Sequence, residues 1–369
     1  MKNCHFTVFH PLLYPQTLKF QLSLQIHQFL FSYGSAHSFH HQPHSGTTRK
    51  GNVVKAIERR IDTQRFAVEI RYTEYAGHAV EIARQAAEEG FDIVVAVGGD
   101  GTVNEVARSL VHTNTALAIV PSGSGNGLAR HLLIPMDIEK ALDVINANVM
   151  TELDYGLIND KPFFCTCGVG FDAFISLKFA EAGSRGLKTY LEKTLTDGLR
   201  YKPETYRIYI GGEEEGEMQE IDAFLIACAN ASQYGNNAYI APDASMKDGL
   251  LDVIVLQPFS MLEAPIVAMQ LFQRTLPNNS HVKTYRTKRL CIERTSAGPA
   301  HCDGDPYDTT ARINVELVPA GLRAIINEKA LVTPPTSSVQ SNMLLRTLEP
   351  FQKQMINLRN HVNSLFDTF

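Results

Sequence analysis

With 369 residues, the chain is long enough for two domains that each bury a core of their own. Hydrophobic residues make up 44% and charged residues 20%, which is typical of a soluble globular protein and excludes a disordered one. The net charge of -5 argues against nucleic-acid binding, because proteins of that class present a basic face to phosphates.

The segment from 52 to 120 alternates helical and strand periods, which predicts a parallel sheet covered by helices. Phe66–Tyr72 alternates like a strand, and His78–Glu89 is typical of an Ala-rich helix. Ile93–Val97 and Ala116–Val120 are continuous apolar runs of the kind that is buried on both faces of a parallel sheet. We therefore predict an open α/β domain over residues 42–150.

Beyond residue 150 the pattern changes to short strand-like runs separated by Gly, Pro and Asn turns. This change favours an antiparallel β-rich domain over residues 151–318. The predicted strands are Phe163–Thr166, Thr205–Ile210, Ile221–Cys228, Leu250–Leu256, Lys288–Glu293 and Ile313–Leu317. The predicted helices are Phe174–Glu181, Tyr190–Leu199 and Met261–Gln273.

Residues 331–369 are predicted to form a linker and an amphipathic helix that begins near Pro350. From Leu344 to Phe369, apolar residues recur at alternating spacings of four and three, which gives a one-sided stripe. This helix would dock on its own domain or on a second copy of the chain in a homodimer. A membrane-facing helix is the weaker alternative, because the segment has little basic character.

No apolar run is long enough to span a bilayer, so a lipid ligand would be met from the water side. The cysteines have neither the paired spacing of a zinc site nor the density of a disulfide scaffold, which fits a reducing, cytoplasmic compartment. They are Cys4, Cys165, Cys167, Cys228, Cys291 and Cys302.

The first of two glycine-rich loops is Gly98–Thr102 (GGDGT), between the predicted strand Ile93–Val97 and a helix. Backbone N–H groups and the positive end of the helix dipole favour an anion at such a turn. Asp100 would repel a phosphate there unless a Mg²⁺ ion lay between them. Thr102 and Glu105 fit a capping box, which would fix where the helix begins.

The second loop, Pro121–Gly127 (PSGSGNG), follows the next predicted strand. Both loops then lie at the carboxyl ends of parallel strands, where open α/β sheets bind their ligands. Neither loop matches a Walker motif or a convincing dinucleotide fingerprint. Further on, His131 is expected on the surface at a helix end rather than on a phosphate.

Three further motifs follow the two loops along the chain. They are Asp154-Tyr155-Gly156, the stretch PDASMKDGLLD from Pro242 to Asp252, and Asp303-Gly304-Asp305. In order and spacing, these five separated motifs resemble the diacylglycerol kinase catalytic domain family, especially its soluble bacterial lipid kinases. The resemblance runs from about residue 42 to residue 326.

The resemblance implies an ATP-dependent lipid kinase whose active site lies in the cleft between the two domains. It implies that Asp305 is the general base and that Asp100 and Asp154 are acidic residues of the active site. It also implies a Mg²⁺ site in the second domain and a last strand, within 319–328, that returns to the first domain. The residues of that Mg²⁺ site would be Ser245, Asp248 and Leu250. The residues implied in nucleotide binding are Gln42, Pro43, Ser45, Gly46, Thr73, Gly98, Gly99, Asp100, Gly101, Thr102, Asn104, Glu105, Ser122, Gly123, Ser124, Gly125 and Asn126.

The second loop departs from the family's G-T-x-N-D pattern, because Ser124 and Gly127 stand at its Thr and Asp positions. The missing carboxylate puts a metal or phosphate contact in doubt. Sphingosine and ceramide kinases of the same superfamily also show a G-S-G-N form, so we expect a diacylglycerol-like or sphingoid acceptor and a protein peripheral to the membrane. An NAD kinase and a catalytically inactive nucleotide- or lipid-binding regulator remain open as alternatives.

The start of the chain also departs from the family, whose first loop, N-P-x-S-G, follows a strand. Here Gln42-Pro43-His44-Ser45-Gly46 follows Ser35–His41, which has no strand-like alternation, so the strand is expected to be missing. The first 44 residues contain no Asp or Glu and hold seven of the 13 histidines. We therefore regard residues 1–41 as an atypical segment and hypothesise a frame error. One codon spelling of His37–His44, shifted by one base, encodes Ile-Arg-Phe-Ile-Ile-Asn-Pro-Ile. A genuine extension is the alternative.

Overall fold

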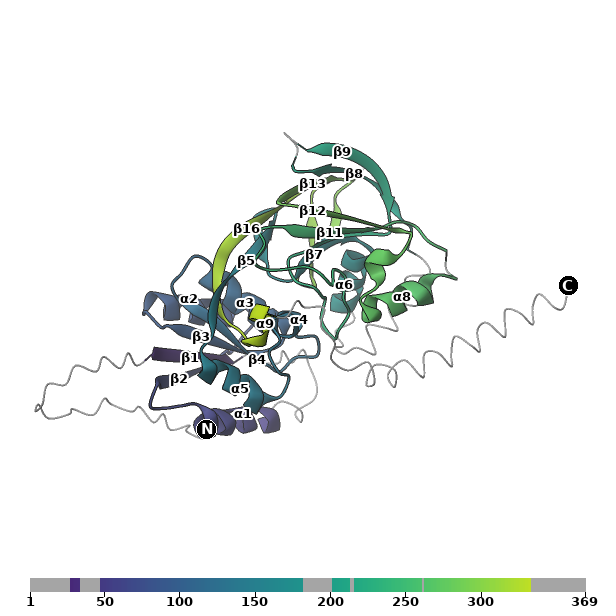
Figure 1. Cartoon of the computed structure of the whole chain (residues 1–369). Helices are drawn as coiled ribbons and strands as arrows, with labels where there is room; N and C mark the ends of the chain where they lie inside the picture. Colours follow the sequence, from purple (N-terminus) through teal and green to yellow (C-terminus); the bar gives the residue numbers. More distant parts are fainter. Residues whose placement is uncertain (1–26, 34–46, 182–200, 213–215, 261, 333–369) are drawn as a thin grey trace, which may run out of the picture.

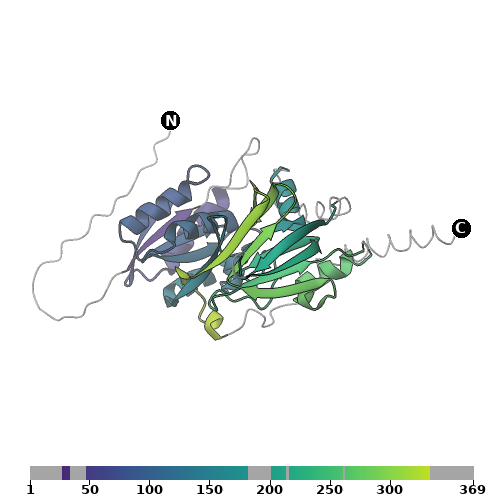
Figure 2. The ribbon, with the colours of Figure 1, turned by 90° about the horizontal axis from the view of Figure 1, so that it is seen from above.

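The computed structural model of the chain describes residues 27–33, 47–181, 201–212, 216–260 and 262–332. These residues form two domains, an α/β domain and a larger β-rich domain (Figures 1 and 2). The predicted fold class is therefore confirmed. None of the helices within the described ranges is long and apolar enough to cross a membrane.

The first domain is built on parallel strands in the order β2-β1-β3-β4. Every residue of β3 and β4 is buried, as the continuous apolar runs predict. Helices α2 and α3 cover one face of this sheet, and α1 and α5 cover the other (Figure 1). The bounds are β1 His27–Tyr33, α1 Thr47–Arg60, β2 Phe66–Tyr72, α2 His78–Glu88, β3 Ile93–Gly98, α3 Asp100–Leu110, β4 Ala116–Pro121, α4 Gly127–His131 and α5 Ile138–Ala147.

The prediction that the first strand is missing is wrong. The strand β1, His27–Tyr33, lies between β2 and β3 and is parallel to both. Its sequence, HQFLFSY, is rich in the aromatic residues that favour strands. It precedes Ser35–His41, the segment in which the family has its first strand. Residues 34–46, which include Ser35–His41, lie outside the described residues.

The second domain packs two sheets face to face. The strands β12-β11-β10-β7-β14-β15 form one sheet, and β8, β9 and β13 join β16 in the other. Its core is apolar on both inner faces, from Val169 and Val253 on one sheet to Tyr206 and Ile292 on the other. The bounds are β7 Thr166–Gly170, α6 Phe171–Glu181, β8 Glu204–Ile210, β9 Glu217–Ala223, β10 Leu225–Ala229, β11 Leu251–Leu256, α8 Ala264–Gln273, η1 Leu276–Asn278, β12 Val282–Thr287, β13 Arg289–Glu293, β14 Gly298–Cys302 and β15 Asp305–Thr309.

Two long strands, β5 (Met150–Ile158) and β16 (Arg312–Ile325), join the domains. They pair antiparallel with each other, and the register shifts between Val318 and Leu322. Before the shift β16 pairs with β13 of the second domain, and after it Ala324 lies beside Leu117 of β4. The first sheet therefore continues through β16 into the second domain (Figure 1). There β6 (Lys161–Phe163) pairs antiparallel with the end of β5.

The described chain ends with α9, Lys329–Val332. The predicted helices Tyr190–Leu199 and the C-terminal amphipathic stripe lie outside the described residues. Their docking partners, including a second copy of the chain, stay predictions.

Candidate active site

The first glycine loop turns directly from β3 into α3. Gly99 is the N-cap, and the helix begins at Asp100. A Cβ on Gly98 would lie 2.6 Å from Oγ1 of Thr102, so a side chain at residue 98 would clash with the first turn. The loop therefore presents backbone groups at the carboxyl edge of the sheet, as anion binding at a helix N-terminus requires.

The predicted capping box is wrong. No side chain caps the N-terminus of α3, because the helix starts at Asp100 and Thr102 already lies in its first turn. Oε1 of Glu105 instead accepts a hydrogen bond of 3.2 Å from N–H of Gly77, at the start of α2. Glu105 thus joins two neighbouring helices, and its contact with a nucleotide stays a prediction.

Asp100 connects the two glycine loops. Its carboxylate accepts from N–H of Asn126 at 2.8 Å and from N–H of Gly127 at 2.6 Å. A Cβ on Gly125 would lie 2.6 Å from Oδ2 of Asp100, so the second loop has to be glycine there. Asp100 therefore acts first as an organiser of the loops. Each of its oxygens keeps a further lone pair, so the carboxylate also fits a cation.

The second loop is folded on itself and packed on the first. Oδ1 of Asn126 accepts from N–H of Gly123 at 3.0 Å, and Nδ2 of Asn126 donates to the Gly123 carbonyl at 2.9 Å. A Cβ on Gly123 would lie 2.4 Å from Cα of Gly99. The hydroxyl-bearing residues Ser122 and Ser124 are exposed beside this contact, where a phosphate can reach them.

Gly127, which replaces the family's acidic residue, lies against the second domain. A Cβ at this position would be 3.3 Å from the carbonyl oxygen of Tyr234 and 3.4 Å from N of Gly235. An acidic side chain would therefore need this neighbouring loop to move. Asp100 already receives the N–H of Gly127, so the loop holds its shape without that carboxylate.

Arg130 and His131, in α4, follow this loop. Nε of Arg130 donates to the Gly125 carbonyl at 2.9 Å, so its cation lies at the loop, a contact that we did not predict. The expectation of a surface His131 is wrong, because this side chain is buried and its Nδ1 accepts from N–H of Ser232 at 3.1 Å. Burial lowers the pKa of His131 to about 4.

Asp305 lies on a hairpin of the second domain, formed by β14 and β15. Asp303 and Gly304 form its two-residue turn, with φ of 49° and 86°, between the paired residues Cys302 and Asp305. Positive φ at both turn residues matches the twist of the strands, and Asp-Gly suits that geometry. Asp305 is exposed at the start of β15.

Asp303, for which we predicted no individual role, anchors the turn. Its carboxylate accepts from N–H of Phe164 at 2.9 Å, of Cys165 at 2.7 Å and of Thr166 at 3.1 Å. It also accepts from Nδ2 of Asn104 at 2.7 Å. Burial raises the pKa of Asp303 above its ordinary value, and these hydrogen bonds act in the opposite direction.

The bond from Asn104 fixes the layout of the site. Asn104 lies in α3, one turn after Asp100, and Asp303 lies in the second domain, two residues before Asp305. We predicted a nucleotide contact for Asn104, but its side chain links the domains. The glycine loops and the acidic hairpin therefore face each other across the domain boundary.

The hairpin also explains a break in the sheet. We predicted one strand over Phe163–Thr166, whereas β6 ends at Phe163 and β7 begins at Thr166. Phe164 and Cys165 turn their N–H groups to Asp303, so these groups are not available to a neighbouring strand.

Asp154 is buried where β5 crosses between the domains. Its carboxylate accepts from N–H of Gly249 at 2.9 Å and from N–H of Ala320 at 2.8 Å. It therefore holds the PDASMKDGLLD loop against the register shift of β16. Its predicted place in the active site stays a prediction.

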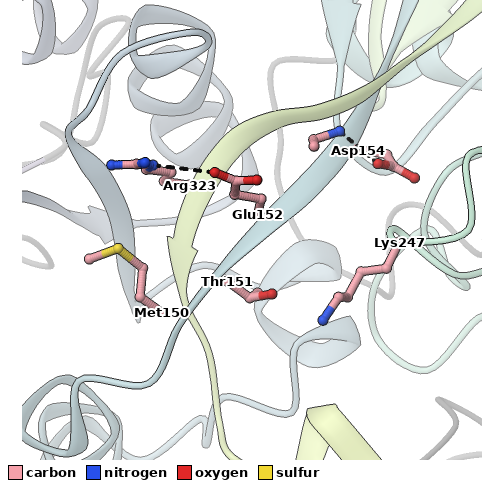
Figure 3. A pocket seen from close by; sticks show the side chains of 7 residues that line it. Met150, Thr151, Glu152, Asp154, Lys247 and Arg323 are labelled. Carbon is pink, nitrogen blue, oxygen red and sulfur yellow. Dashed lines mark hydrogen bonds and ion pairs between the residues drawn. The ribbon is translucent and has the colours of Figure 1, made fainter.

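A pocket of about 620 Å³ opens beside Asp154 (Figure 3). Lys247 points toward it from the PDASMKDGLLD loop, and Arg323 pairs with Glu152 at 3.6 Å on the paired strands (Figure 3). The other lining residues are Met150, Thr151 and Ala320.

The predicted metal residues of the second domain have protein partners in this structure, and their role in binding Mg²⁺ stays a prediction. The carboxylate of Asp248 is already bonded to the guanidinium of Arg286 and to N–H of Leu250, and the Ser245 hydroxyl accepts from N–H of Lys247. Nowhere in the described ranges do three or more His, Cys, Asp or Glu side chains gather as metal ligands.

The remaining predicted nucleotide residues divide into two groups. Gln42, Pro43, Ser45 and Gly46 lie outside the described residues. Thr73 follows β2 and is half-buried; because β2 runs parallel to β3 and β4, Thr73 lies at the same edge of the sheet as both loops.

Two glycine loops at the carboxyl edge of a parallel sheet, joined through Asn104 and Asp303 to a hairpin of the second domain, are compatible with a phosphotransferase site. Residues 39–158 match the diacylglycerol kinase catalytic domain, and residues 166–326 match the YegS C-terminal NAD kinase beta sandwich-like domain. The chain therefore belongs to the diacylglycerol kinase family, among the YegS-like lipid kinases.

Individual relatives agree with this membership. A probable lipid kinase YegS-like of Chromohalobacter salexigens is 30% identical over 243 residues, 64% of this chain and 77% of that protein. A diacylglycerol kinase of Bacillus subtilis is 30% identical over 240 residues, 63% and 77% of the two chains. The fold, taken separately, is similar to that of the crystal structure of a putative diacylglycerol kinase from Bacillus anthracis, with a TM-score of 0.65 at 21% identity over 83% of this chain and 98% of that one.

Proposed function

We propose that this chain transfers the γ-phosphoryl group of ATP to a hydroxyl of a diacylglycerol-like or sphingoid lipid. The observation that supports this proposal is the hydrogen bond from Asn104, in the helix after the first glycine loop, to Asp303, two residues before the exposed Asp305. One side of the site offers backbone N–H groups to phosphates, and the other offers a carboxylate to an acceptor hydroxyl. Phosphoryl transfer requires this combination of positioning and charge neutralisation.

Each group has a definite part in the reaction. The loops Gly98–Thr102 and Ser122–Asn126 hold the phosphates of ATP, and Arg130 adds a positive charge beside them. Asp305 takes the proton of the acceptor hydroxyl. The hydroxyl oxygen of the acceptor forms a bond to the γ-phosphorus, and the bond from the γ-phosphorus to the oxygen that leaves with ADP breaks. A Mg²⁺ ion bound with the nucleotide would neutralise phosphate charge, and Asp100 is the carboxylate placed to hold it.

The acceptor belongs to the lipid class because the relatives of this chain carry lipid kinase names. Lipids of this class reside in bilayers, so we place the enzyme at the cytoplasmic face of a membrane as a peripheral protein. The second loop has Ser124 in the G-S-G-N form that sphingosine and ceramide kinases also show. Sphingoid lipids are therefore proposed as acceptors in addition to diacylglycerol.

Transfer from labelled ATP tests the proposal. The purified chain is incubated with micelles that contain diacylglycerol, ceramide, sphingosine or polyprenol, and with NAD in a parallel reaction. Label in a lipid supports the proposal; label in NAD, or in no acceptor at all, contradicts it.

Asp305→Asn is the matched variant for this assay. We expect turnover to fall by about a hundredfold or more, with ATP affinity within about twofold of the wild type, since a general base acts on the transition state. Equal losses in turnover and in ATP affinity would make Asp305 a binding residue instead.

A further inference from the structure

Behind the Asp303-Gly304 turn lies a buried polar cluster that the reaction described above does not use. His301, in β14, and Asp172, in the first turn of α6, are 1% and 7% exposed. Nε2 of His301 is 3.0 Å from Oδ2 of Asp172, and the Tyr234 hydroxyl donates to the same oxygen at 3.2 Å. Oδ1 of Asp172 accepts from N–H of Ala173 at 2.8 Å. A buried carboxylate with this many donors is held in one orientation.

The hydrogen bonds fix the tautomer of His301. Nδ1 accepts from N–H of Gly304, at 3.4 Å, and therefore carries no proton. The proton of the neutral ring is then on Nε2, which donates to Asp172. His301 thus links the buried carboxylate to the turn that presents Asp305.

The side chains of this cluster are closely packed. A Cβ on Gly168 would lie 2.6 Å from Oδ2 of Asp172 and 3.2 Å from Nε2 of His301. The rings of Tyr234 and His301 meet edge to face, with centroids 6.2 Å apart. A displacement of Tyr234 is therefore transmitted to Asp172 and His301 rather than absorbed by empty space.

The other end of the cluster touches the second glycine loop. The carbonyl oxygen of Tyr234 lies 3.3 Å from the position that a Cβ of Gly127 would take, and Gly235 packs on Gly125 in the same way at 3.0 Å. N–H of Asn236 donates to the Gly125 carbonyl at 3.1 Å. A ligand that fixes the second loop therefore also fixes the segment that carries Tyr234.

We propose that Tyr234, Asp172 and His301 form a positioning relay, which couples occupancy of the second glycine loop to the placement of the hairpin that carries Asp305. The effect of the relay on turnover rests on the proposed function, because the group that the relay positions, Asp305, is the proposed general base. Its physical content is independent of the acceptor, because it concerns how firmly the Gly304 turn is held.

Tyr234→Phe tests the relay with a single lost hydroxyl. Tyr285→Phe is the matched control, because it also removes one hydroxyl hydrogen bond, to Gln219 at 2.8 Å, from a strand remote from the hairpin. His301→Asn keeps an acceptor near the Nδ1 position and loses the donor to Asp172, whereas His301→Gln keeps the donor and loses the acceptor. The two substitutions therefore break opposite ends of the link.

We expect Tyr234→Phe and both His301 variants to lower kcat by about tenfold to a hundredfold, the cost typical of a misplaced reacting group. KM for ATP stays within about twofold, and Tyr285→Phe keeps wild-type kcat. A wild-type kcat in both His301 variants, or an equal loss in the Tyr285→Phe control, overturns the proposal.

Amide hydrogen exchange separates this proposal from the proposed function. Without any nucleotide, the Gly304 amide should exchange faster in Tyr234→Phe than in the wild type and in Tyr285→Phe. Unchanged exchange at Gly304 overturns the relay, even where lipid phosphorylation is found. Faster exchange supports the relay even where no lipid accepts label, and in that case only the proposed function fails.

Discussion

At the scale of single residues, Asp100 shows how one carboxylate can shape a site before any ligand binds. Its two hydrogen bonds hold the backbone of the second loop next to the first loop. Charged acceptors of backbone N–H groups contribute more than neutral ones, so the loops depend strongly on this residue.

We predict that Asp100→Ala lowers turnover by more than about tenfold, or about 1.4 kcal/mol in the barrier, and leaves the fold intact. The reason is that the loops lose their common anchor while the cores of both domains are untouched. Turnover with the accepting lipid and circular dichroism check the two parts. A variant that keeps more than about a tenth of wild-type turnover would show that Asp100 is dispensable.

His131 gives a prediction about pH. Its pKa is lowered by burial to about 4, from an ordinary value of 6.5. Between these values the unfolded chain binds a proton that the folded chain does not, so stability falls as pH drops from 6.5 to 4. The free energy of unfolding is expected to fall by about 3 kcal/mol over this range and not to change for this reason above pH 7.

Urea unfolding of the wild type and of His131→Asn at several pH values measures this dependence. Asn keeps an acceptor for N–H of Ser232 and cannot titrate, so its stability should fall less over this range. If both proteins lose the same free energy from pH 6.5 to 4, His131 is not the source.

At the scale of elements, the pair β5 and β16 decides how the two domains are held. The register shift in β16 brings Gly321 under the ring of Tyr155, where a Cβ would lie 2.4 Å from Cε1. The hydroxyl of Tyr155 is hydrogen-bonded to Nε2 of His112 at 3.1 Å, and N–H of His112 donates to the Gly321 carbonyl at 2.8 Å. The backbone at Gly321 therefore has no room for a side chain on the Tyr155 side.

Gly321→Ala should therefore destabilise the protein by about 1–3 kcal/mol, as overpacking does. Thermal or urea unfolding measures the loss. The double variant with Tyr155→Leu should lose less than the sum of the two single changes, because the smaller side chain makes room. If the loss in the double variant equals the sum of the two single losses, the strain does not come from the contact between residue 321 and Tyr155.

The elements also show what the sequence could predict. β3 and β4 are buried on both faces, and their continuous apolar sequences predict this burial. The break between β6 and β7 could not be read, because its cause is Asp303, a partner from the far end of the chain. The capping box failed for a similar reason: Glu105 prefers a neighbouring helix to its own N-terminus.

At the scale of the whole molecule, the site depends on contacts that no local pattern encodes. Asn104 and Asp303 are 199 residues apart in sequence, and their bond places Asp305 opposite the loops. Resemblance to a family pointed to Asp100 and Asp305, but Asp303, Arg130 and the buried His301 became visible only once the domains were packed together.

The first strand raises a question that concerns the entire first sheet. In the structure β1, His27–Tyr33, occupies the place between β2 and β3. The match to the family's catalytic domain begins later, at residue 39. The shifted reading of His37–His44 would supply a second candidate strand, Ile-Arg-Phe-Ile-Ile, directly before an Asn-Pro loop. Only one of the two can fill the position.

We predict that a chain carrying the shifted reading is more stable than the chain as written, because an apolar strand would then lead straight into the loop. A rise in the unfolding midpoint and a gain in ATP affinity check this, with Asn in place of Gln42 alone as the control for the loop. Sequencing the coding DNA around codons 36–46 decides the origin. Codons that cannot yield the shifted reading refute the frame error, and β1 is then the native strand.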